Sequence, residues 1–419
     1  MKRILKIVQS QTIKDSLVVF VGLGVTAVLG FVFTIIMART LQPVGFGVFS
    51  ALTSLVAIIY SLGDLGVGPA IINFLPKQKN SEDGLIASTF WFQYLVGIIL
   101  AVSFWLLARY SNLLIPGSTI EHFVLVGSLA FNYVLVGWSQ SIFTAKKNFF
   151  RLSLSQIIDA VVKMSIVLLL FRFGKLTIST ALIANFVSAI LSLMITYWRQ
   201  LLIINFRFDT KTFTKIYHYS KWIAVSRFFS VFFSRIDIIL LNLLATSYLA
   251  GIYAAASRIT LLFAMVVSAL GSVVNPRFSS FKTKSETVDY IKKLFLLISG
   301  VSVAVIICVF LSKFIVLTVF GFGYSDSIRV FQLLAISMIP FLYSVIFTAS
   351  ILYTFHKTSF YALTTFVQLL SVVIINIIFI PKIGVYAPVL ASAISNLLVF
   401  CLSALKLKVL FKSEKISVS

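Results

Sequence analysis

Charged side chains within long apolar stretches are the residues of this sequence that could do chemistry. The bases and acids in such positions are Lys163, Arg227, Arg235, Arg258, Lys313, Asp64, Asp159 and Asp237. A base at the centre of a bilayer costs roughly 2.5–3.5 kcal/mol, so each needs a partner, a route to the interface or a water-filled cavity. Because bases outnumber acids, we expect an interior that attracts anions. Guanidinium groups bind phosphate oxygens through charge-assisted, often bidentate hydrogen bonds, so a diphosphate would suit this interior.

Helical spacing separates these charges into groups. Asp159 and Lys163 are four residues apart with the acid first, the favourable orientation for an ion pair along a helix. This spacing fits a structural pair and a pair that lines a cavity equally well. Asp64 lies at the end of its apolar stretch, where we expect it to cap or pack a helix. Lys313 lies near the end of another stretch, and its long side chain can reach the interface.

The stretch 219–244 places polar side chains on one helical face. These residues, at spacings of three and four, are Ser226, Arg227, Ser230 and Ser234. At roughly 100° per residue, Arg235 is about 80° from Arg227 and about 160° from Asp237. Arg235 and Asp237 therefore need partners on other helices, whereas we expect Arg227 and Arg258 to line a cavity. The candidates for contact with a substrate are Arg227, Arg258, Arg235, Lys163, Asp159, Ser230 and Ser234.

The elements that must position these residues are membrane-spanning helices. Of the 419 residues 60% are apolar and 11% charged, against about a quarter charged in a soluble protein. Runs of roughly 20 apolar residues match the thickness of a bilayer core. We predict an all-α integral membrane protein with about twelve helices at 16–38, 45–66, 85–108, 122–145, 152–173, 176–198, 219–244, 248–274, 294–320, 328–354, 358–380 and 384–410.

The distribution of Lys and Arg between the loops predicts the orientation of the chain. With the N-terminus in the cytoplasm, 24 of the 35 bases fall in cytoplasmic segments and six in external loops. Membrane proteins commonly carry such an excess of bases on the cytoplasmic side. We therefore expect both termini to be cytoplasmic. The same bias accounts for most of the net charge of +23 without nucleic acid as a partner.

Two halves of the sequence share short patterns. The segment Gly47–Ala51 recurs as Gly251–Ala255, an offset of 204 residues. Four further residues of the first half have the same residue type 210 positions later: Lys147, Phe150, Gly174 and Ala181. We predict a parallel repeat of two six-helix bundles, residues 1–200 and 219–419, joined by a cytoplasmic linker at 201–218. Substrate is expected to pass between the halves of such a repeat.

Several motifs resemble those of the polysaccharide exporters, the O-antigen-type flippases of the multidrug/oligosaccharidyl-lipid/polysaccharide exporter superfamily. The stretch Met37–Phe49 is similar to the family's Ala-Arg-x-Leu-Gly-Pro…Gly motif, with Gln42 at the position of the first Gly. Gly63–Gly68 resembles the Asp-Leu-Gly-Leu-Gly motif at the end of the second helix, and Arg235-Ile236-Asp237 with Gly251–Ala255 resembles the signature of helices 7 and 8. The residues that we assign to structural motifs are Arg39, Pro43, Gly47, Asp64, Asp237 and Gly251.

This resemblance implies a flippase for a polyprenyl-diphosphate-linked oligosaccharide. Such a protein works by alternating access in the plasma membrane of a prokaryote, in contact with membrane lipid and with H⁺ or Na⁺ as a candidate coupling ion. Cys308 and Cys401 lie in apolar runs without metal-ligand or disulfide spacing. We therefore expect no catalytic residue, no metal and no cofactor, and a transporter rather than an enzyme.

Three other functions stay open. A cation-coupled multidrug exporter of the same superfamily would depend on Asp64 or Asp237 rather than on the arginines. A membrane glycan polymerase or glycosyltransferase needs a catalytic segment, whereas the longest external loop, near Arg109–Glu121, has about a dozen residues and one acid. A scaffold without transport would not explain why arginines are kept in the bilayer.

Overall fold

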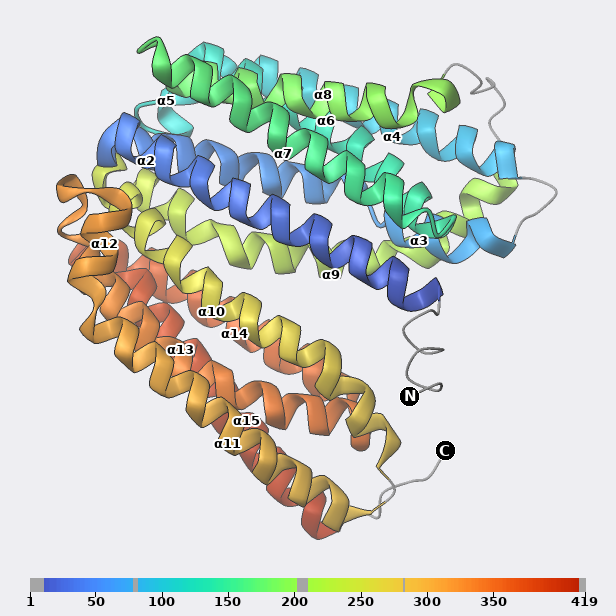
Figure 1. The fold of residues 1–419 in the computed structure, drawn as a ribbon, viewed down its shortest axis with the longest axis vertical. Coiled ribbons are helices and arrows are strands. Elements are labelled where there is room, and N and C mark those ends of the chain that lie inside the picture. The colour runs from blue at the N-terminus through green and yellow to red at the C-terminus, as the bar shows by residue number, and fades with distance from the viewer. Residues whose placement is uncertain (1–10, 78–81, 202–209, 282, 414–419) are drawn as a thin grey trace. The chain divides into compact units, whose positions relative to one another are not determined.

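The computed structural model describes residues 11–77, 82–201, 210–281 and 283–413, and within these ranges every regular element is a helix (Figure 1). Ten helical segments of the described chain are long and apolar enough to cross a membrane. The protein is therefore an all-α, multi-pass membrane protein. Its contacts divide it into two compact units, residues 1–235 and 236–419, and the division falls within α9 (Thr210–Leu244).

The first unit is built around one central helix. The α-helices that precede α9 are α2 (Gln11–Asp64), α3 (Val67–Phe74), α4 (Glu82–Leu107), α5 (Ser111–Leu114), α6 (Ile120–Ala145), α7 (Phe149–Arg172) and α8 (Ile178–Leu201). Helix α6 packs against α2, α3, α4 and α8. Its start is fixed by a capping box, in which Thr119 and His122 each accept a hydrogen bond from the other's backbone N–H. Near its end Trp138 is buried and donates to the Thr89 hydroxyl of α4 at 3.0 Å.

Helix α2 contains a break at a single residue. Gln42 has φ 55° and ψ 172°, and Pro43 begins the second arm. Proline suits this place because it has no backbone N–H to leave unbonded in the first turn of a helix. The Gln42 amide donates back to the carbonyl of Arg39 at 2.8 Å. Helices were expected at 16–38 and 45–66; the helical backbone instead continues through most of the predicted gap.

The predicted linker at 201–218 is only partly within the described residues. Residues 202–209 lie outside them, and Thr210 begins α9, which then runs for 35 residues. Residues 1–10, three of which are basic, and residues 414–419 lie outside as well.

In the second unit, too, one helix packs against several others. Its helices after α9 are α10 (Ser247–Ser280), α11 (Lys284–Phe310), α12 (Ser312–Phe320), α13 (Ser327–Ala349), α14 (Thr358–Ile383) and α15 (Tyr386–Ser413), with short turns at Phe322–Tyr324 and Ser350–Thr354. Helix α13 packs against α10, α11 and α15, and α14 packs against α15. The turn at Ser350–Thr354 has π-helical geometry and ends α13.

The helix predicted at 294–320 is in fact two helices. Helix α11 begins ten residues earlier, at Lys284, because Thr283 and Glu286 form a capping box. It ends at Phe310, and α12 starts at Ser312. Lys313 is therefore exposed in the first turn of a short helix rather than near the end of a long one.

Candidate functional site

A cavity of about 510 Å³, with several polar side chains in a largely apolar wall, lies in the first unit. Both arms of α2 contribute to its wall, together with α6, α7 and α8. Ligand sites in proteins commonly measure about 300–1,000 Å³ and carry a few well-placed polar groups on apolar walls. The polar side chains in this wall are Thr26, Thr53, Tyr60, Tyr133, Gln140, Gln156, Asp159, Lys163 and Asn185.

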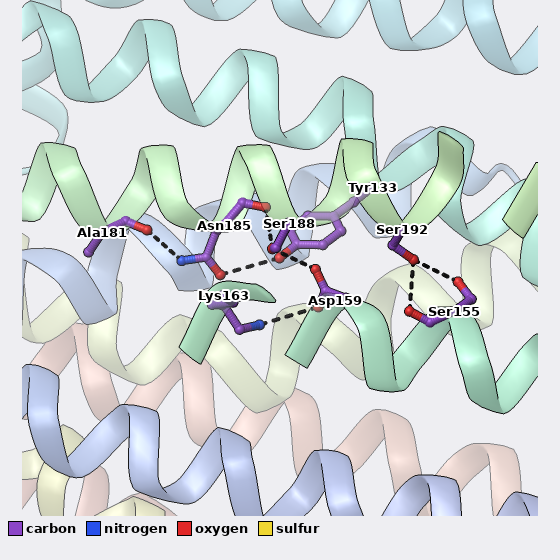
Figure 2. Close-up of polar contacts among 8 residues, drawn as sticks. All are labelled: Tyr133, Ser155, Asp159, Lys163, Ala181, Asn185, Ser188 and Ser192. Atoms are coloured by element: carbon purple, nitrogen blue, oxygen red, sulfur yellow. Dashed lines mark hydrogen bonds and ion pairs between the residues drawn. The ribbon is translucent and has the colours of Figure 1, made fainter. Parts of the chain in front are cut away.

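The charged residues of the cavity compensate each other. Lys163 Nζ lies 3.3 Å from Asp159 Oδ2, one turn apart on α7. The Ser188 hydroxyl of α8 donates to Asp159 Oδ1 at 2.7 Å, as Figure 2 shows. Lys163 Nζ also lies 5.6 Å from the centre of the Phe33 ring, within the range of a cation–π contact. The spacing alone fitted a structural ion pair and a cavity-lining pair equally well. In the structure the pair is both: an ion pair along α7 and part of the cavity wall.

Hydrogen bonds between α6, α7 and α8 hold this wall in place (Figure 2). The Tyr133 hydroxyl lies 3.4 Å from Asn185 Oδ1, and the amide of Asn185 donates to the carbonyl of Ala181 at 2.7 Å. Further along, the Ser192 hydroxyl donates to the carbonyl of Ser155 at 2.7 Å. Polar groups between membrane helices bond to one another in this way because lipid offers no water as an alternative partner.

Other polar groups in the wall have no protein partner. Within the described part of the chain, the side chains of Tyr60, Gln140 and Gln156 form no hydrogen bond, although all three line the cavity. The Tyr60 and Tyr133 rings meet edge to face, with centroids 6.4 Å apart. These groups are therefore free to bind a ligand that carries hydroxyl or amide groups.

Arg227 lies in an ion pair with Asp64. Its Nη1 is 2.7 Å from Asp64 Oδ2, while Asp64 Oδ1 accepts from the backbone N–H of Gly68 at 3.2 Å. The two partners differ in exposure, because the Asp64 side chain is 9% exposed and the Arg227 side chain 47%. A guanidinium has five N–H donors, so Arg227 can hold Asp64 and still offer donors to an anion.

The glycines around Asp64 permit this arrangement. Gly66 has φ 72°, a conformation that favours glycine. A Cβ atom at Gly68 would lie 2.8 Å from the Ser141 hydroxyl, 3.0 Å from Asp64 Oδ1 and 3.7 Å from Arg227 Nη1. The motif Gly63–Gly68 therefore brings α2, α3, α6 and α9 close enough for the ion pair to form.

In the second unit, Asp237 has partners on two other helices. Its Oδ2 accepts from the Tyr253 hydroxyl of α10 at 2.9 Å, and its Oδ1 accepts from the Asn376 amide of α14 at 2.6 Å. Tyr253 belongs to the segment Gly251–Ala255, which is buried throughout. The two motifs that the sequence contains near residues 237 and 251 are thus joined by one hydrogen bond.

The remaining predicted residues occupy other environments. Arg235 and Arg258 are half-buried, in the first and second units respectively. Ser230 and Ser234 are exposed, and the Ser234 hydroxyl donates to the carbonyl of Val231 at 2.9 Å. The motif residues Pro43 and Gly47 are buried and Arg39 is exposed.

Sequence reasoning did not identify uncharged polar side chains that line the cavity, namely Tyr60, Tyr133, Gln140, Gln156 and Asn185. It also did not identify Ser188, which donates to Asp159. One signal was available on α7, since Gln156 precedes Asp159 by three residues and Lys163 by seven and therefore shares their face. The contributions of α6 and α8 could not be found this way, because their polar residues are isolated in apolar helices and show no spacing that points to a site.

The sequence matches a known family over most of its length. The family model described as polysaccharide biosynthesis protein matches residues 12–282. A Shigella flexneri protein with a provisional O-antigen transporter name is 26% identical over 181 residues, a match that covers 42% of this chain and 42% of the relative. An uncharacterized membrane protein of Methanocaldococcus jannaschii is 25% identical over 414 residues, or 92% of this chain and 95% of the relative.

Solved transporters share the fold. The lipid II flippase MurJ in an inward closed conformation superposes with a TM-score of 0.77 at 16% identity, covering 94% of this chain and 87% of that one. An inward-facing multidrug resistance transporter of the MATE family, in the MOP superfamily, gives a TM-score of 0.75 at 14% identity and covers 94% and 99%. At these identities the likeness concerns the fold.

Proposed function

Because the chain belongs to the polysaccharide biosynthesis protein family, we propose that it moves a polyprenyl-diphosphate-linked oligosaccharide across the plasma membrane of a prokaryote. It acts as a transporter and not as an enzyme. The observation that carries this proposal is the pairing of two features in one unit. A half-exposed guanidinium, Arg227, can bind phosphate oxygens, and a cavity with uncharged polar side chains in its wall can receive uncharged hydroxyl groups.

The proposed topology has twelve spans. Helix α2 is 54 residues long, or about 80 Å, which is far more than the ~30 Å hydrocarbon core. It therefore provides two spans, one before and one after Gln42, and α9 provides another. An even number of spans puts both termini on the same side, the cytoplasmic one by the distribution of Lys and Arg.

A parallel repeat is supported by matching turns in the two units. Gly174 follows α7 with φ 65°, and Gly384, 210 positions later, follows α14 with φ 56°. Ala181 and Ala391, also 210 apart, are both fully buried on the next helix. Transport then proceeds by alternating access of the two units, with the polyprenyl tail left in lipid and H⁺ or Na⁺ as the coupling ion.

The experiment uses purified protein in proteoliposomes with the lipid-linked oligosaccharide of the host in the inner leaflet. An impermeant glycosidase outside the vesicles detects the glycan that has crossed. We expect transport by the wild type and a fall of about tenfold or more in Arg227→Gln, because hydrogen bonds to charged groups are worth about 1.5–3 kcal/mol. Arg172→Gln, at the exposed end of α7, is the matched control and should transport normally.

Two results would contradict the proposal. The first is a wild-type rate no greater than that of protein-free vesicles. The second is extrusion of cationic dyes without movement of the lipid, which would indicate a multidrug exporter. The compensated charges of Asp159 and Lys163 do not favour a cationic ligand in the cavity.

A further inference from the structure

The cavity in the first unit offers hydrogen bonds without net charge. Asp159 and Lys163 neutralise each other, and the phenol of Tyr60 and the side-chain amides of Gln140 and Gln156 have no hydrogen-bond partner among the described residues. Amides donate and accept at once, as do hydroxyls. A ligand that matches them must carry many neutral donors and acceptors, which is the chemistry of a sugar and not of a lipid tail, a free phosphate or a drug cation.

The aromatic part of the wall suits the same ligand. The Tyr60 and Tyr133 side chains, from α2 and α6, both line the cavity, and their rings meet edge to face. An aromatic ring supplies large apolar contact area with a polar end, so it can pack on the C–H face of a pyranose while neighbouring amides bind its hydroxyls. A volume of about 510 Å³ limits the occupant to a short saccharide.

The cavity lies next to the Arg227 ion pair. Tyr60 precedes Asp64 by one turn of α2, a separation of about 5–6 Å between Cβ atoms. On α6, Gln140 precedes Ser141, whose hydroxyl would be 2.8 Å from a Cβ atom at Gly68, beside Arg227. A diphosphate at Arg227 would therefore place its attached sugars close to Tyr60 in the cavity wall.

We infer that this cavity is a saccharide subsite, which takes the uncharged sugar residues nearest the diphosphate of the transported lipid and holds them through Gln140, Gln156 and Tyr60. The inference rests on the proposed function, because that function supplies the diphosphate at Arg227. The second unit provides a comparison: a cavity of about 250 Å³ there has tyrosines, threonines and Gln368 in its wall, and no charged side chain among the described residues lines it.

The test measures binding to full-length protein in nanodiscs. One probe is the polyprenyl-diphosphate-linked glycan extracted from the host membrane, and the other is the same polyprenyl diphosphate without sugar. We expect wild-type protein to prefer the glycan-bearing lipid. Gln140→Leu with Gln156→Leu should lower the affinity for it about tenfold to a hundredfold, the loss of two hydrogen bonds, and leave the affinity for the bare lipid unchanged.

Two control variants separate this inference from the proposed function. Arg227→Gln should weaken binding of both lipids, whereas Gln368→Leu in the second unit should change neither. If the double leucine variant keeps the full preference for the glycan-bearing lipid while Arg227→Gln weakens both, the subsite is wrong and the flippase proposal stands. If neither lipid binds the wild type, the proposed function itself fails.

A further variant tests whether the sugar is neutral. Asp159→Asn leaves the Lys163 ammonium without its carboxylate and so makes the cavity cationic. The affinity for the glycan-bearing lipid relative to that for the bare lipid should then be no greater than before, because both lipids carry the diphosphate and only one carries the sugar. A rise in this ratio would show that the sugar is acidic and would overturn the assignment of an uncharged residue to this cavity. Thermal unfolding of each variant, which should match the wild type within a few degrees, shows that the fold is kept.

Discussion

Asp64 connects the start of one helix with an arginine from a distant one. Its Oδ1 accepts from the first turn of α3, and its Oδ2 accepts from Arg227, 163 residues further along the chain. The carbonyl of Asp64 also accepts from the Gln93 amide of α4 at 2.9 Å. Asp64 is buried and Arg227 half-exposed. Loss of the ion pair would therefore destabilise the buried carboxylate more than the guanidinium, which water can solvate.

Removing this acid should therefore destabilise the first unit. We expect Asp64→Asn to lower the free energy of unfolding by about 1–2 kcal/mol, because it leaves Arg227 without its carboxylate and weakens the bond from Gly68. Denaturant unfolding in detergent micelles measures this change. In a double-mutant cycle with Arg227→Gln, the two losses should be less than additive; full additivity would mean that the pair contributes nothing.

Gln42 occupies a backbone conformation that is nearly reserved for glycine. With φ 55° and ψ 172°, it stands where the resembling family motif has Gly. We expect Gln42→Gly to stabilise the protein by about 1 kcal/mol through relief of this strain, reduced by the loss of its bond to Arg39. The melting temperature in detergent should rise accordingly.

A β-branched residue provides the opposite change at this position. Gln42→Val should lower the melting temperature, because a branched side chain tolerates positive φ less well than Gln does. Equal stability of the glycine and valine variants would show that the break in α2 carries no strain.

Close helix packing in the first unit depends on small residues. A Cβ atom at Gly127 of α6 would lie 2.9 Å from the Ala101 carbonyl oxygen and 3.3 Å from the Ala101 Cα, both backbone atoms of α4. Backbone cannot rotate away as a side chain can, so α4 and α6 would have to separate. Small residues serve the same purpose in other membrane helices, where packing takes the place of the hydrophobic effect.

We therefore expect Gly127→Ala to destabilise the protein by about 1–3 kcal/mol, the usual cost of overpacking. The control is Gly300→Ala in the middle of α11, where an added Cβ atom meets nothing within 4 Å. That variant should be neutral or slightly more stable, because Ala favours helix over Gly. Unfolding of both variants in the same detergent tests the contrast, and equal losses would disprove it.

At the scale of the whole molecule, the predicted orientation of the chain can be tested on one helix. Phe150 and Phe173 lie at opposite ends of α7, and both are exposed, by 66% and 72%. With cytoplasmic termini, we expect Phe150 to lie on the cytoplasmic side and Phe173 on the external side.

Single cysteines at these positions, with Cys308 and Cys401 replaced by serine, give the measurement. An impermeant maleimide should label Phe173→Cys in intact cells, and Phe150→Cys only after permeabilisation. Labelling of Phe150→Cys in intact cells would reverse the topology and place the predicted excess of bases outside the cell.

Membership of the exporter family was predicted from three short motifs and is confirmed by the match over residues 12–282. The structure explains why such motifs carry information. Gly66 and Gly68 allow the ion pair of Asp64, and Tyr253 binds Asp237. The prediction of a continuous helix at 294–320 was wrong, because apolar residues continue on both sides of the turn at Leu311 and the composition does not show the break.

The sequence alone determined that this protein is a bundle of membrane helices, because the length and apolarity of a spanning helix are set by the bilayer and can be counted along the chain. It also determined the Asp159–Lys163 pair, which depends only on helical spacing. The tertiary structure decided which distant residues meet: Arg227 with Asp64, Asn376 with Asp237, and the uncharged side chains of four helices around one cavity. These contacts depend on how the helices pack and rotate against one another, and local periodicity does not record that.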